Sequence, residues 1–269
     1  LDQVLKIDPK HPGANHFYIH AVEASADPGQ GLYSAKLYDE GLVPGAGHLV
    51  HMPSHIYIRT GDYHKGTRAN INAVASDSSY TTACHAQGVY PLAYYPHNYH
   101  FLAATATLEG NSKWGIEAAE KVSEQVNIQL MQEPGWSTLQ HFYTIPYYVY
   151  VKFAKWDKIL EMPEEKPSLT YPCAVRAYAR GMAFLGKNNI VGAKKELEQI
   201  EDLSKDETLK ELTIFDINSI YDLVIIAKDV LNAEILASEE NYDEAISLLK
   251  KAIKVEDHLN YNEPPDWFF

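Results

Sequence analysis

The chain has 269 residues, of which 46% are hydrophobic and 22% charged, and its formal net charge is −13. This balance is typical of a globular protein, and no apolar run approaches the roughly 20 residues that a membrane-spanning helix needs. The negative charge, without any cluster of Lys and Arg, argues against a nucleic-acid-binding protein, because phosphate contacts are made mainly by those side chains.

Several familiar catalytic motifs are missing from the sequence. There is no Gly-rich phosphate loop, no GxSxG elbow and no HExxH, so nucleotide-binding, serine-hydrolase and zincin functions are not indicated. The two cysteines, Cys84 and Cys173, form no CxxC pair, so neither a disulfide scaffold nor a thiolate zinc site is predicted. These residues leave the cellular compartment open.

Apolar periodicity and turn residues predict a succession of helical hairpins after a partial helix at residues 1–8. Paired helices are expected at 12–25 with 30–42, 47–60 with 62–77, 96–109 with 112–131, 138–153 with 155–161, 171–185 with 189–203, and 213–237 with 242–258. Stacked hairpins form one elongated body, so we expect a single domain over residues 1–269. Both ends stop where a further helix would continue the pattern, which predicts a fragment of a longer chain.

Residues 78–95 exceed the usual spacing between hairpins. Long insertions in compact folds tend to be functional or disordered. Tyr90, Tyr94 and Tyr95 lead directly into His97, so we expect this insertion to form a lid over a site.

Two prolines fall at the same position of their helices. Pro53 and Pro146 each remove a backbone donor and should kink the helix that contains them. For Pro53 the alternative is that a helix begins at the proline. In that case His48 and His51 would lie on a turn, outside the face that carries His55.

Three short segments carry potential metal ligands at helical spacing. They are His16, His20 and Glu23, then His48, His51 and His55, and then His97 and His100. Residues three and four apart share one face of a helix, so each set projects its side chains from one stripe. Neither a solvated face nor an apolar core explains this composition, which favours a site. His11, His64, His85 and His258 fall outside the pattern.

An internal repeat supports the same interpretation. The segments that begin at Gly61, Gly110, Ala154, Gly186 and Glu240 each read as a turn followed by an amphipathic helix. With Tyr57, Gly61, Asp62, Tyr63 and Ala73 in one unit, and Tyr242, Ala245 and Ala252 in another, the chain resembles the tetratricopeptide repeat superfamily. The resemblance implies an all-α, right-handed α-α superhelix of about six hairpins.

The resemblance also implies that the histidines converge. His97 and His100 each lie 49 residues after His48 and His51, at equivalent positions of first helices that line the concave groove of the superfamily. The same reasoning implies that further side chains line this groove as ligand contacts: Tyr57, Arg59, His141, Arg176 and Arg180. Guanidinium groups suit carboxylate or phosphate ligands, although ordinary ion pairing is the alternative for the arginines.

Imidazole is a common ligand of zinc, copper and iron. The eight residues His16, His20, Glu23, His48, His51, His55, His97 and His100 therefore predict one or two transition-metal ions, with zinc or copper ahead of iron. Glu23 is either a ligand or a general base for a metal-bound water. Such a site would suit a hydrolase or an oxidoreductase that acts on a small anionic substrate.

The rival hypothesis is a repeat scaffold without catalysis. Binding of a protein or peptide segment in the concave groove is the usual role of the superfamily, and the histidines would then form hydrogen bonds to tyrosines and to the bound segment. The sequence alone does not decide between these two functions.

Overall fold

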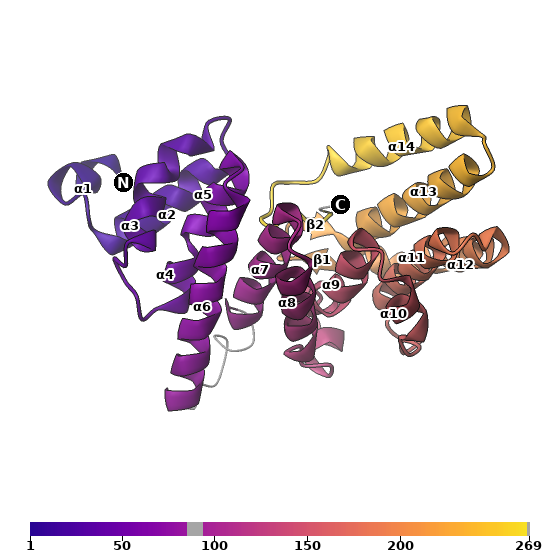
Figure 1. The fold of residues 1–269 in the computed structure, drawn as a ribbon, viewed down its shortest axis with the longest axis horizontal. Helices are drawn as coiled ribbons and strands as arrows, with labels where there is room; N and C mark the ends of the chain where they lie inside the picture. Colours follow the sequence, from indigo (N-terminus) through magenta and orange to yellow (C-terminus); the bar gives the residue numbers. More distant parts are fainter. Residues whose placement is uncertain (85–93, 268–269) are drawn as a thin grey trace. The chain divides into compact units, whose positions relative to one another are not determined.

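The computed structural model describes residues 1–84 and 94–267, most of them in α-helices (Figure 1). Two compact units make up the chain, residues 1–125 and residues 126–269. The all-α class is confirmed, whereas the single superhelical domain stays a prediction. Among the described helices, none has the length and apolar content required to cross a bilayer.

The first unit contains the first three predicted hairpins. Its helices are α1 (Asp2–Ile7), α2 (Pro12–Glu23), the 3₁₀ turn η1 (Pro28–Gly31), α3 (Leu32–Asp39), α4 (Gly47–His51), α5 (Pro53–Thr60), α6 (Tyr63–Cys84), α7 (Tyr95–Glu109) and α8 (Ser112–Glu124). Helix α6 packs against α4, α5 and α7, and α7 packs against α8. The helices that carry the predicted metal ligands therefore belong to one unit.

The second unit contains the remaining hairpins. Its elements are η3 (Leu130–Gln132), α9 (Thr138–Lys152), α10 (Trp156–Glu161), α11 (Thr170–Gly186), α12 (Ile190–Leu203), η4 (Glu207–Lys210), the short strands β1 (Thr213–Ile214) and β2 (Asn218–Ser219), α13 (Ile220–Ser238) and α14 (Tyr242–Glu256). Helices α11 and α12 pack together, as do α13 and α14.

The predicted turns share one backbone feature. In five of the six hairpins, a residue with positive φ stands two positions before the second helix: Gly61, Gly110, Ala154, Asn188 and Glu240. The sequence alignment placed four of these correctly and set the fifth at Gly186, two residues early. A left-handed residue ends a helix because it breaks the right-handed backbone path. The same turn geometry thus recurs in five hairpins.

Pro53 is the first residue of α5, and Met52 separates this helix from α4. The alternative that a helix begins at the proline is thus the observed one. Pro146 lies inside α9, as predicted. Of the predicted lid, residues 78–84 continue α6 and Tyr95 begins α7, while 85–93, with His85 and Tyr90, lie outside the described residues.

Three predicted helix boundaries were wrong by more than a turn. The helix expected over 62–77 continues to Cys84. The helix expected over 112–131 ends at Glu124, and the Asn127 side chain then accepts hydrogen bonds from the backbone amides of Gln129 and Leu130 to form a turn. The helix expected from residue 213 begins at Ile220. Phe215 and Asp216 both adopt positive φ in the tight turn between β1 and β2, which a right-handed helix cannot contain.

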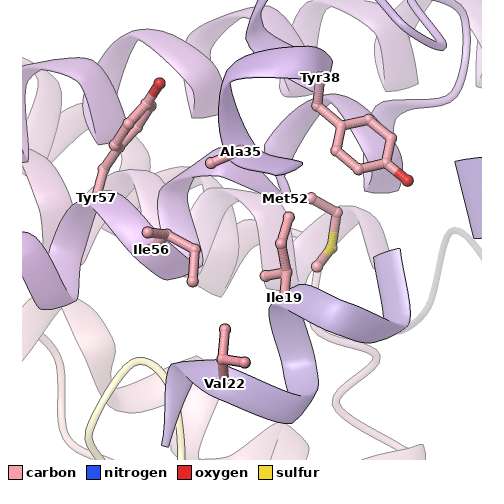
Figure 2. Packing of buried hydrophobic residues seen from close by; sticks show 7 residues of the cluster. All are labelled: Ile19, Val22, Ala35, Tyr38, Met52, Ile56 and Tyr57. Carbon is pink, nitrogen blue, oxygen red and sulfur yellow. The ribbon is translucent and has the colours of Figure 1, made fainter. Parts of the chain in front are cut away.

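Two adjacent stripes on α2 have opposite chemistry. Figure 2 shows Ile19 and Val22 of α2 pointing toward Met52 and Ile56, in a core that also includes Ala35, Tyr38 and Tyr57. His20 directly follows Ile19 and Glu23 directly follows Val22, and His16 lies one helical turn before His20. These three residues therefore form the stripe next to the apolar one. Burial of the apolar stripe against α5 thereby holds the ligand stripe beside the same helix.

Asp77 of α6 connects the start of α4 with α7. Its carboxylate lies directly against Gly47, the first residue of α4, and accepts a hydrogen bond from Asn98 Nδ2 at 2.6 Å. Asp77 and Asn98 are both fully buried. Because His48 follows Gly47 and His97 precedes Asn98, this contact fixes two ligand-bearing segments relative to each other.

The close approach at Gly47 predicts the effect of a single methyl group. A Cβ added there would lie 1.9 Å from Asp77 Oδ1, whereas one added at Gly45 meets nothing within 4 Å. We expect Gly47→Ala to lower the free energy of unfolding by about 1–3 kcal/mol through overpacking, as measured by urea denaturation. Gly45→Ala is the matched control, and equal stability of the two variants would contradict the packing at Asp77.

Candidate metal centre

Seven of the eight predicted ligands gather within the first unit. His16, His20 and Glu23 come from α2, His48 and His51 from α4, His55 from α5, and His97 from α7. Ligand atoms lying within 4.8 Å of one another define three groups among the described residues: His16 with His20 and His48, His48 with His51 and His97, and His20 with Glu23 and His55. His48 and His20 each belong to two groups, so the groups form one continuous cluster. We call these seven residues the histidine cluster.

His100 is the predicted ligand that joins none of these groups among the described residues. It is buried in α7 three residues after His97. The equivalence between His51 and His100, suggested by the repeat, therefore does not extend to the same surroundings.

On α2, His20 contacts both of the other predicted ligands. His20 Nε2 lies 3.2 Å from His16 Nε2, and His20 Nδ1 lies 2.8 Å from Glu23 Oε1. Two ligand atoms bound at 2.0–2.1 Å to a tetrahedral ion are separated by about 3.3–3.4 Å. The two Nε2 atoms thus already have the spacing that a shared ion requires.

Contacts between helices join the α2 ligands to those of α4 and α5. Glu23 Oε2 forms a hydrogen bond with His55 Nδ1, across from its bond to His20. The rings of His20 and His55 are 4.9 Å apart between centroids, and those of His16 and His48 are 5.3 Å apart. Although α4 ends before Pro53 and α5 begins there, His51 and His55 remain in the same cluster.

The remaining imidazoles form the interior of the cluster. Ring centroids are separated by 5.0 Å between His48 and His51, by 4.8 Å between His51 and His55, and by 5.0 Å between His51 and His97. The ring of Phe101 packs against three of these imidazoles, at 4.4 Å from His55, 5.0 Å from His97 and 5.1 Å from His51. Phe101 therefore forms an apolar wall on the interior side.

Exposure changes across the cluster. His51 and His55 are buried, with 0% and 3% of their surface exposed, whereas the side chain of His20 is 35% exposed. His16 and His48 are half-buried, and the ring of Tyr94 stacks edge-on against His48 at 4.9 Å. The cluster thus has a solvent-facing side at His16 and His20 and an interior side at His51 and His55.

Burial favours the neutral form of most of these imidazoles. Burial first, and neighbouring imidazoles second, lower the pKa of His48 to about 3 and that of His16 to about 4. The pKa of His51 is held well below its usual range for the same reasons. A metal ion binds neutral imidazole, so the cluster holds its ligands in the form that coordination needs.

Glu23 is held in its ionised form. Burial alone would raise the pKa of this carboxyl group, but hydrogen bonds from His20 and His55 lower the pKa to about 2. Glu23 is 7% exposed, and it contributes the carboxylate group among the seven residues of the histidine cluster. It therefore supplies one negative charge beside the buried imidazoles.

Two interior nitrogen atoms have no hydrogen-bond partner among the described residues. They are Nε2 of His51 and Nε2 of His55, and both are buried. An unsatisfied buried polar atom costs about 1–3 kcal/mol. A metal ion would use both lone pairs, so these atoms fit a centre on the interior side.

The other predicted groove residues of this unit have different surroundings. Tyr57 is 4% exposed, packs in the core of Figure 2, and directs its hydroxyl to Asp39 Oδ2 at 3.3 Å. Its position is that of a packing residue. Arg59 is exposed near the end of α5.

The predicted groove residues of the second unit make local contacts. His141 is fully buried and shares a hydrogen bond of 2.9 Å with the Tyr171 hydroxyl. Arg180 Nε donates to Glu196 Oε1 at 2.7 Å, and Arg176 Nε donates to the Pro163 carbonyl oxygen at 2.9 Å. The pairing of Arg180 matches the alternative of ordinary ion pairing. Roles for these three residues in ligand binding stay predictions.

Sequence reasoning missed the residues that support the ligands. Phe101 follows His97 by four residues, so helical spacing alone could have placed it on the same face. The contact of Asp77 with Gly47 and Asn98 joins residues far apart in the sequence and leaves no periodic signal.

Neither the scan against models of known protein families nor the search of curated proteins found a match to this chain. The functional assignment therefore rests on the geometry of the histidine cluster.

The lowered pKa values predict how stability depends on pH. In the unfolded chain an imidazole titrates near 6.5, whereas in the folded cluster burial lowers the pKa of His16, His48 and His51. As pH falls below about 6.5, the unfolded chain binds protons that the folded chain does not, so the free energy of unfolding decreases. The slope is about 1.4 kcal/mol per pH unit for each fully buried imidazole.

We therefore expect metal-free protein to lose stability steadily between pH 7 and pH 5 in urea denaturation. Replacing His51 by Gln removes one buried imidazole and should reduce the slope by up to about 1.4 kcal/mol per pH unit. Equal slopes for the two proteins would show that His51 is not held neutral.

Proposed function

We propose that this chain is a tetratricopeptide-like protein whose first unit binds transition-metal ions through the histidine cluster. The observation that carries the proposal is the convergence of six imidazoles and one carboxylate from α2, α4, α5 and α7. A single buried histidine is usually a structural residue. Here six imidazoles lie close together, and within the described part of the chain two of them have an interior nitrogen atom without a hydrogen-bond partner, which bound ions explain better.

The donor set supports a metal of intermediate softness. Imidazole nitrogen atoms suit zinc, copper, iron and nickel, whereas calcium and magnesium prefer oxygen ligands. The three groups of convergent ligand atoms contain no cysteine among the described residues. Zinc or copper is favoured over iron, because di-iron sites in helical proteins rely on several glutamates and the cluster offers Glu23 alone.

The solvent-facing side of the cluster supports a catalytic use of the metal. His20 is partly exposed, so a ligand from solution can approach the ion beside it. A bound zinc ion can lower the pKa of a coordinated water to about 7, and copper or iron would supply redox chemistry. The proposed activity is that of a hydrolase or an oxidoreductase on a small anionic substrate.

Metal analysis of untagged protein tests this proposal. After loading with zinc and exhaustive dialysis, we expect a stoichiometric amount of zinc by inductively coupled plasma mass spectrometry. The double variant His48→Ala, His51→Ala removes both ligands of α4, of which His48 belongs to two of the three groups, and it should retain less than a tenth of that amount.

His64→Ala is the matched control for this experiment. His64 lies outside the cluster with its side chain 72% exposed, and it pairs with Glu109. We expect this variant to bind zinc as the wild-type protein does. If wild-type protein retained no zinc after dialysis and was as stable as before zinc loading, the proposal would be contradicted. That result would support a groove that binds a protein or peptide segment.

A further inference from the structure

Glu23 occupies a special position between two imidazoles from different helices. Oε1 lies 2.8 Å from Nδ1 of His20 on the same helix, and Oε2 contacts Nδ1 of His55 on α5. Each carboxylate oxygen thus has its own imidazole partner. The contact is also enclosed, since Glu23 and His55 are both buried.

The chemistry of these contacts fixes the tautomers of both rings. An ionised carboxylate can only accept hydrogen bonds, so the proton of each contact is on Nδ1 of the histidine. A neutral imidazole with its proton on Nδ1 has its lone pair on Nε2. His20 and His55 therefore both present Nε2 as a potential metal ligand.

Those two Nε2 atoms face different parts of the cluster. Nε2 of His20 is 3.2 Å from Nε2 of His16, on the solvent-facing side. Nε2 of His55 is buried without a hydrogen-bond partner among the described residues, and so is Nε2 of His51, whose ring centroid is 4.8 Å from that of His55. One carboxylate consequently orients one ligand on each side.

We infer that the cluster holds two metal ions and that Glu23 is a positioning residue shared by both. The outer ion would be bound by His16, His20 and His48, and the interior ion by His51, His55 and His97. This inference rests on the proposed metal-binding function and goes beyond it in the number of ions and in the role of Glu23.

Exposure and the contacts of Phe101 support this division. His16, His20 and His48 are all partly exposed, and their ligand atoms form one of the three convergent groups. In the interior set, the ring of His51 is 4.8 Å from His55 and 5.0 Å from His97, whereas His55 and His97 are 6.1 Å apart. All three interior rings pack on Phe101. Three protein ligands per ion leave a position for water or substrate, as in catalytic zinc sites.

The same geometry argues against Glu23 as a direct ligand. Both of its oxygen atoms already accept N–H hydrogen bonds, and coordination of an ion would compete with them. Metal-binding histidines usually donate their second ring N–H to a carboxylate or a carbonyl group, and loss of that partner typically weakens metal affinity by 10–100-fold. Glu23 would play this role for two histidines at once.

Zinc titration of wild-type protein and of Glu23→Gln tests the inference. We expect two zinc ions per wild-type chain, and loss of one of them in either His16→Ala or His51→Ala. A glutamine oxygen can accept from one imidazole but not from both, because its other terminal atom is a donor. Glu23→Gln should therefore bind zinc 10–100-fold more weakly at one centre at least.

Nuclear magnetic resonance of ¹⁵N-histidine-labelled, zinc-loaded protein separates positioning from ligation. We expect His20 and His55 to carry zinc on Nε2 and a proton on Nδ1. Glu109→Gln is the matched control for Glu23→Gln. Glu109 also accepts a hydrogen bond from a histidine Nδ1, that of His64 at 2.8 Å, but it lies outside the cluster, so this variant should bind zinc as the wild-type protein does. Glu23→Asp keeps two acceptor oxygen atoms, so it should preserve the Nδ1 proton of His20 and provides a folded comparison if Glu23→Gln is unstable.

The outcomes distinguish the inference from the proposed function. One zinc ion per wild-type chain would overturn the two-ion inference and leave the proposed function standing. Zinc on Nδ1 of His20 or His55 would overturn the positioning role of Glu23. No bound zinc in a folded wild-type protein would overturn the proposed function itself.

Discussion

The burial of imidazole nitrogen atoms is the constraint on which the structure of the first unit depends. A buried ring must have partners for its polar atoms, and Nε2 of His51 and Nε2 of His55 have none among the described residues. Burial also keeps these rings neutral, so repulsion between charged imidazoles is avoided at neutral pH. Buried nitrogen atoms without partners destabilise the metal-free protein, but the same neutral imidazoles are in the form that binds a metal ion.

The cluster is held in place by contacts outside it. The apolar stripe of α2, with Ile19 and Val22, packs next to the ligand stripe and fixes the helix against α5 (Figure 2). The buried carboxylate of Asp77 contacts the start of α4 and bonds to Asn98 of α7. Ligand positions on separate segments are thus set by packing that does not involve the metal, as preorganised sites require.

The sequence predicted the hairpins and most of the ligands because both leave periodic signals. Ligands three and four residues apart, such as His16 and His20, mark a shared helix face, and turn residues such as Gly61 mark the helix ends. The strand turn at Phe215 and Asp216 was missed, since a bulky aromatic residue such as Phe215 rarely adopts positive φ and Asp216 alone is a weak turn signal. The double contact of Glu23 and the role of Asp77 depend on how helices pack, and no local pattern records that.

X-ray absorption spectroscopy of the zinc-loaded protein can show whether these histidines converge on the metal. We expect an inner shell dominated by nitrogen at about 2.0–2.1 Å from zinc, with the outer-shell scattering that several ordered imidazole rings produce. An inner shell of oxygen alone, without imidazole scattering, would show that the ion binds elsewhere and would contradict convergence of these histidines on a metal.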